Sequence, residues 1–328
     1  MPLAAIGDDI SNFFGAVGDF FGRLAEIQLG ALALGLAFFG LYLSIRARAY
    51  FHVLRAAYPD ERIAFRRIWG AYIAAYGFNN VIPARGGDVI KLFLVKNSIP
   101  GSTYSAVGAS MAVELVFDAV MGVFILAFAF SQGVFPKPPD FARLNAFDLS
   151  FLAGHPRFTL FLLTVLAALG LLAFALLSRR VRAFWTRVRQ GVTILRDRRR
   201  YLREVFAVQF AGWLCRFAAF WFLLEAFNIG GSVRNVLLVL GVNAVAAAVP
   251  FTPGGAGVQQ AFLVKVFAGT AAGATVAAYS VGQQIAIGAL SLGLGFVALF
   301  TIFRFRSFRD VIAAGRADRE AERVAAKA

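Results

Sequence analysis

The sequence from Tyr76 to Lys96 reads YGFNNVIPARGGDVIKLFLVK and interrupts an otherwise apolar part of the chain. It places two amides, a proline, a Gly-Gly pair and charges of both signs between hydrophobic flanks. Irregular backbone at membrane depth is tolerated only where it is buried in protein or lines a wet cavity. We therefore expect two short helices joined by a polar break that has a function.

A second break lies far down the chain, from Asn243 to Lys265, and reads NAVAAAVPFTPGGAGVQQAFLVK. Each break has an Asn, then a Pro, then a Gly-Gly pair, and ends in Phe-Leu-Val-Lys, at residues 93–96 and 262–265. The shared order of these features indicates that the two segments are related parts of one architecture.

The composition is that of a membrane protein. Hydrophobic residues make up 59% of the 328 residues, and the formal net charge is +15. Because the arginines cluster beside apolar runs, the charge is typical of cytoplasmic loops and not of nucleic-acid binding. The single cysteine, Cys215, excludes an internal disulfide and is read as a small buried residue.

The apolar runs predict an all-α polytopic protein with one transmembrane domain over residues 28–310. Residues 1–27 are expected to form an amphipathic interfacial helix, and residues 311–328 a basic cytoplasmic tail. Arg46 and Arg48 are expected to snorkel to the interface at the end of the first span. The expected full spans cover residues 29–45, 104–130, 158–177, 204–228 and 274–303.

The two breaks are expected to form re-entrant hairpins, because each arm is too short for a full crossing of about 30 Å. The basic segments then fall on one face, which places the C-terminus in the cytoplasm of a multi-pass protein in the plasma membrane. Residues 29–130 and 204–303 become inverted repeats with a hairpin each. This pattern is typical of transporters and places a site between the breaks.

A helix that begins inside the membrane presents free amides and a positive dipole end, which favour a phosphate or carboxylate. We expect such starts at Gly86 and Gly254, the second with Thr252 as its N-cap and Pro253 in its first turn. Arg85 suits a lipid phosphate. Alternatively, Asp88 pairs with Arg85 or Lys91, and no ligand is required.

Charged residues also occur inside two predicted spans. Glu114 and Asp118 lie four residues apart, on one helical face, and could neutralise Arg85 or Arg216, bind a cationic headgroup or carry a proton. Arg216 requires a partner, for which these acids or Glu225 are candidates, and a purely structural ion pair is the alternative. The candidate substrate-binding residues are Asn79, Asn80, Arg85, Gly86, Gly87, Asp88, Lys91, Glu114, Asp118, Arg216, Asn243, Thr252, Pro253, Gly254, Gly255, Gly257, Gln259 and Gln260.

No enzyme signature competes with this interpretation. His52 and His155 are far apart in the sequence, and no metal-ligand spacing or nucleophile elbow is present. The glycine-rich run at Gly254 lacks the Lys-Ser/Thr of a P-loop. We expect no catalytic residue, no metal and no cofactor.

The chain resembles the lysylphosphatidylglycerol synthase transmembrane-region family, also called the flippase-like domain family. Its Asn-x-x-x-Pro-x-Arg break is similar to Asn79 to Asp88, and its acid-bearing helix to Glu114 to Asp118, with Leu115 where Arg is usual. Its Pro-Gly-Gly-x-Gly break is similar to Pro253 to Gln260, with Gln where Glu is frequent.

The resemblance implies a protein that moves an anionic phospholipid, an aminoacylated phospholipid or a glycosylated polyprenyl or hopanoid lipid between leaflets. Membrane lipids are then the expected partners, with a lipid-modifying enzyme as a further one. Two other classes stay open: an accessory protein that scaffolds such an enzyme, and a membrane-embedded transferase. A scaffold would tolerate loss of Arg85 and Glu114, and a transferase would turn over lipid in detergent.

Overall fold

The computed structural model describes residues 22, 26–82, 86–132, 186–246 and 258–305, and these residues form helices and connecting turns without a strand. The expected span at 158–177, the tail at 311–328 and most of the interfacial helix lie outside the described residues. Four described helices are long and apolar enough to cross a membrane, which confirms the predicted all-α polytopic class. They are Leu29–Ala57, Tyr104–Ile125, Arg198–Ala226 and Gly273–Phe303.

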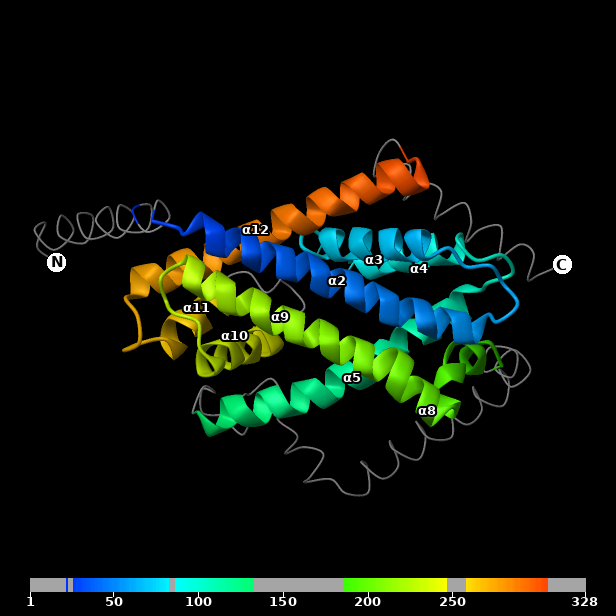
Figure 1. Cartoon of the computed structure of the whole chain (residues 1–328), viewed down its shortest axis with the longest axis horizontal. Coiled ribbons are helices and arrows are strands. Elements are labelled where there is room, and N and C mark those ends of the chain that lie inside the picture. Colours follow the sequence, from blue (N-terminus) through cyan, green and yellow to red (C-terminus); the bar gives the residue numbers. More distant parts are fainter. Residues whose placement is uncertain (1–21, 23–25, 83–85, 133–185, 247–257, 306–328) are drawn as a thin grey trace, which may run out of the picture.

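The long helices form the frame of the molecule (Figure 1). Helices α2 and α9 run antiparallel, since the Gln28 N–H donates to the Ala226 carbonyl at one end and Gly212 lies against Ile45 further along. A short 3-10 turn at Thr193–Arg196 precedes α8, and π-helical turns at Leu202–Phe206 and Leu299–Phe303 precede α9 and follow α12. The bounds are α2 (Leu29–Ala57), α5 (Tyr104–Ser131), α8 (Arg198–Tyr201), α9 (Ala207–Ala226) and α12 (Gly273–Ala298).

Two pairs of short helices correspond to the two sequence breaks. The first pair is α3 (Phe65–Asn79) and α4 (Gly86–Lys96), and the second is α10 (Val233–Ala246) and α11 (Val258–Val266). At 1.5 Å per residue none of them exceeds about 23 Å, less than the hydrocarbon thickness of about 30 Å. The pairs lie toward opposite ends of the helical bundle (Figure 1).

Close backbone approaches fix the first short pair in place. A Cβ at Gly87 would lie 2.1 Å from the Ala75 carbonyl oxygen, so α4 can begin against α3 only with glycine there. A Cβ at Gly77 would lie 2.5 Å from the Ser291 carbonyl oxygen, so α3 packs tightly on α12. The Asn80 amide also donates to Ser291 Oγ at 3.0 Å. Small residues at such crossings join the first and last parts of the chain.

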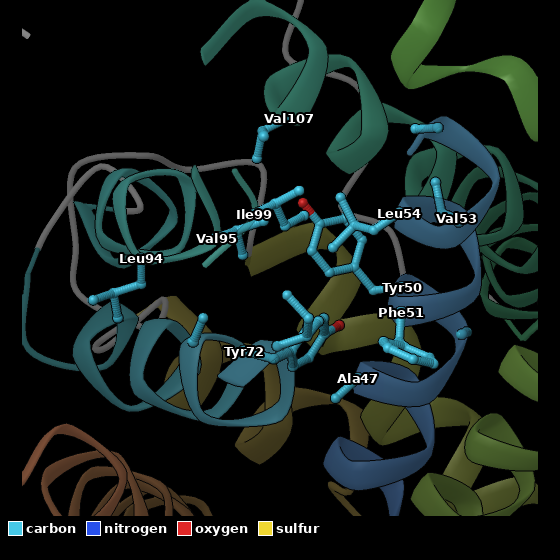
Figure 2. Close-up of a cluster of buried hydrophobic side chains, with 14 of the residues drawn as sticks. Ala47, Tyr50, Phe51, Val53, Leu54, Tyr72, Leu94, Val95, Ile99 and Val107 are labelled. Carbon is cyan, nitrogen blue, oxygen red and sulfur yellow. The ribbon is translucent and has the colours of Figure 1, made fainter. Parts of the chain in front are cut away.

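The apolar core consists of two clusters of buried side chains. The first, seen in Figure 2, gathers residues of α2, α3, α4 and α5, among them Tyr50, Tyr72 and Val95. The second joins the early part of α2 to α9, α10, α11 and α12. Along α2 the second cluster ends at Leu43 and the first begins at Ala47. Residues 44–46, which include Arg46, therefore belong to neither apolar cluster.

Candidate functional site

A cavity of about 480 Å³ lies where the two apolar clusters separate, and its described wall comes from α2, α3, α4, α5, α9 and α10. The site therefore uses elements of both predicted repeats. The predicted site residues that line it are Asn79, Asp88, Lys91, Glu114, Asp118, Arg216 and Asn243.

Arg46 is a buried cation of this wall, with 7% of its surface exposed. Its Nη1 and Nη2 atoms donate to the two carboxylate oxygens of Asp118 at 2.5 and 2.9 Å, and its Nε donates to the Tyr72 hydroxyl at 3.0 Å. The expectation that Arg46 snorkels to the interface is wrong. Because α2 continues to Ala57, Arg46 lies inside the bundle, where a bidentate carboxylate offsets its desolvation.

Lys91 and Glu114 form a second buried ion pair. The Lys91 Nζ donates to Glu114 Oε2 at 2.6 Å, and the ammonium lies 3.9 and 4.2 Å from the ring centroids of Tyr50 and Tyr72. Glu114 Oε1 lies 3.8 Å from Arg46 Nη2. These four residues, Arg46, Lys91, Glu114 and Asp118, are called the charged quartet. With two cations and two acids, the quartet is neutral overall.

The structure thus gives the two acids of α5 different partners from those expected. They pair with Arg46 and Lys91 and not with Arg216, while Arg85 lies outside the described residues. Arg216 lies 5.8 Å from each of the ring centroids of Tyr42 and Phe220, and no described acid lies within ion-pair distance of it. Glu225, the other candidate, accepts the Gly231 N–H at 2.9 Å.

The start of α4 is capped by a side chain of α3. Asn79 Oδ1 accepts the Gly87 N–H at 2.8 Å, and Asn79 Nδ2 donates to Asp88 Oδ1 at 3.1 Å. The Gly87 amide, expected to be free for a ligand, is therefore satisfied within the protein. These contacts fix the start of α4 against the end of α3.

Several predicted residues do not line the cavity. Asn80 binds Ser291, and Gln260 Nε2 donates to Gln284 Oε1 at 2.7 Å, which joins α11 to α12. Gly86, Gly87 and Gln259 also lie outside the described cavity wall. The remaining predicted residues fall outside the described part of the chain: Arg85, Thr252, Pro253, Gly254, Gly255 and Gly257.

The cavity also contains aromatic and charged residues that sequence reasoning missed. Tyr42 and Arg46 of the cavity wall lie four residues apart on α2, and Tyr72 and Tyr76 repeat that spacing on α3. Spacing of four keeps side chains on one helical face, so a polar stripe through an apolar span was the available signal. Trp213, one turn before Arg216 on α9, also lines the cavity.

Long apolar helices around a polar, charge-lined cavity define a multi-pass α-helical membrane protein. The family model of the lysylphosphatidylglycerol synthase TM region matches residues 17–295, and the chain belongs to this family. Searches of curated proteins and of solved structures gave no significant match. The assignment to this family therefore rests on the match over residues 17–295, a range that contains both breaks and the acids of α5.

Proposed function

We propose that this protein is a lipid transporter that moves a lipid between the two leaflets, with the headgroup in the central cavity. The observation that carries the proposal is the cavity itself, which brings ionisable residues of five helices together inside a bundle of membrane-spanning length. Ionisable groups at membrane depth are costly and mark substrate paths. Membership of a family with a flippase-like role supports the same conclusion.

The two short pairs act in this proposal as re-entrant hairpins that enter from opposite faces. Their lengths and their positions at opposite ends of the bundle support this arrangement, with 29–130 and 204–303 as inverted repeats. Transporters of this kind place the substrate where broken helices meet. In this proposal the headgroup also contacts Arg85 and Gly254, as expected from the sequence.

The lipid tails stay in the bilayer beside α5. Leu115 lines the cavity and is exposed, and Val116, Val120 and Phe124 of the same helix are exposed apolar residues. An exposed apolar face next to a polar cavity lets the headgroup and the tails of one lipid occupy different environments. The substrate class is an anionic phospholipid, an aminoacylated phospholipid or a glycosylated polyprenyl or hopanoid lipid.

The protein works in this proposal without catalysis, in the plasma membrane and with its C-terminus in the cytoplasm. The density of arginine from Arg196 to Arg203 supports the orientation, because such segments stay on the cytoplasmic side. A lipid-modifying enzyme is the proposed protein partner, since the lipid must be made or used at one leaflet.

The test is a leaflet-accessibility assay in proteoliposomes that contain fluorescent phospholipids or glycolipids. Wild type is expected to move one of these classes, and Arg85→Ala to abolish the movement with the fold intact. Arg234→Ala, at an exposed arginine of α10 outside the cavity wall, is the matched control and should stay active. Wild type that moves no lipid in any class contradicts the proposal. Lipid turnover in detergent would indicate a transferase instead.

A further inference from the structure

Arg216 is the cation of the cavity wall that has no acid opposite it among the described residues. It lies on the long helix that continues from α8 through α9, and its described contacts are the faces of Tyr42 and Phe220. Aromatic faces attract a guanidinium but leave its five N–H donors unused. A charge in this position requires a counter-charge from elsewhere.

The charged quartet does not supply that counter-charge. Its two carboxylates are engaged by Arg46 and Lys91 at 2.5 to 2.9 Å, and its two cations are engaged by the same carboxylates. An anion that bound Arg46 or Lys91 would have to displace the carboxylate that the cation already binds, which is unfavourable. An anion that meets Arg216 displaces no ion pair in the described structure.

Two other residues of the same cavity wall each have a buried polar atom without a hydrogen-bond partner in the described structure. Trp213 Nε1 and Asn243 Oδ1 are buried without a hydrogen-bond partner in the described structure, and both residues line the cavity. The Trp213 ring is positioned by Phe210 and Phe217, with centroids 6.2 and 5.7 Å away. An indole N–H only donates and a carboxamide oxygen only accepts, so the residues of this wall offer one donor and one acceptor in addition to the Arg216 guanidinium.

We propose that Arg216 and Trp213 bind the phosphodiester of the transported lipid, and that Asn243 accepts a hydrogen bond from a hydroxyl or amine next to it. This rests on the proposed transport function and specifies the group that the cavity recognises. A phosphodiester carries one negative charge, which matches the single positive charge of Arg216. Its oxygens suit the planar guanidinium fork and the indole N–H.

The first experiment measures binding and does not depend on transport. Purified protein in a neutral detergent is titrated with a fluorescent phosphodiester lipid, and with a neutral glycolipid of the same tails. Arg216→Gln should weaken phosphodiester binding by about 10- to 100-fold and leave glycolipid binding unchanged. Arg216→Lys should recover part of the loss, since it keeps the charge without the fork, and Trp213→Phe should show a smaller loss.

The matched control is Arg234→Gln, which removes an exposed arginine that binds Gln132 and should not change binding of either lipid. Inorganic phosphate is added as a competitor to separate the two sources of the anion. Weak competition supports a lipid headgroup, whereas complete displacement of the lipid at millimolar phosphate would overturn the assignment to a lipid. Equal losses for both lipids, or no loss in Arg216→Gln, would also overturn it.

The second experiment repeats the leaflet assay with the same two lipids. Selective loss of phosphodiester transport in Arg216→Gln supports the inference. If wild type binds the phosphodiester lipid through Arg216 but moves no lipid, the transport proposal fails and the binding site stands. If transport occurs and Arg216→Gln leaves it unchanged for both lipids, the transport proposal stands and this site fails.

Discussion

Helices α5 and α9 both bring charge to the central cavity, but only the charges of α5 are compensated. Glu114 and Asp118 each meet a cation at hydrogen-bond distance, whereas Arg216 meets two aromatic faces. Paired buried charges fix the relative positions of the helices that carry them. An unpaired charge in a cavity wall is instead available to a ligand. The charges of α5 therefore have a structural role, whereas the Arg216 charge of α9 is available to the proposed ligand.

Breaking the Lys91–Glu114 pair should have the largest effect. Glu114→Leu leaves the Lys91 ammonium buried without its acid, and removal of one partner of a buried pair costs about 3–5 kcal/mol. We expect a clear fall in the melting temperature of the purified protein, followed by tryptophan fluorescence. Lys91→Met combined with Glu114→Leu should regain most of the loss, because no charge is left unpaired. A melting temperature unchanged in Glu114→Leu would show that the pair is not structural.

Asp118→Asn should have an intermediate effect. It removes the negative charge that Arg46 binds through two hydrogen bonds, but the Asp118 side chain is 44% exposed and Arg46 keeps its hydrogen bond to the Tyr72 hydroxyl. Loss of such a charge-assisted contact is expected to cost about 1–2 kcal/mol. The same melting experiment checks this, and a loss as large as that of Glu114→Leu would remove the distinction between the exposed and the buried acid.

Of the three single variants, Arg216→Gln should change the melting temperature least and the binding of the phosphodiester lipid most. The variant removes two cation–π contacts worth about 0.5–1 kcal/mol each and also relieves an unpaired charge, so the two effects offset each other. The melting temperature should stay near that of wild type while phosphodiester binding falls. A large loss of stability would mean that Arg216 belongs with the quartet, and the comparison between α5 and α9 would no longer hold.

The positions of most described helices could be predicted from the sequence, but the end of α2 could not, since this helix continues to Ala57 and not only to residue 45. Apolar runs and the break after Asn79 mark where described helices stop, and α4, α5 and α12 begin within a few residues of the expected positions. The resemblance to the family was recognised from the same breaks and from the acids of α5. The arrangement of the short helices relative to a membrane stays a prediction.

The ion-pair and hydrogen-bond partners of the residues in and near the cavity could not be predicted from the sequence. Arg46 and Arg216 look alike in the sequence, since each is an arginine close to or inside an apolar run. Which of them meets an acid depends on how α2 and α9 rotate about their axes, and that is decided by packing, as at Gly212 against Ile45. The capping of Gly87 by Asn79 likewise depends on the close approach of α3 and α4.

The cavity is expected to be wet although the helices around it are long enough to cross a membrane. The direct measurement is labelling by a small water-soluble maleimide in native membranes, in a Cys215→Ala background. Ala112 and Val123 are both exposed on α5, but only Ala112 lines the cavity. Ala112→Cys should be labelled, whereas Val123→Cys, which lies outside the cavity wall, should not be. Failure to label Ala112→Cys, or equal labelling at both positions, would contradict this expectation.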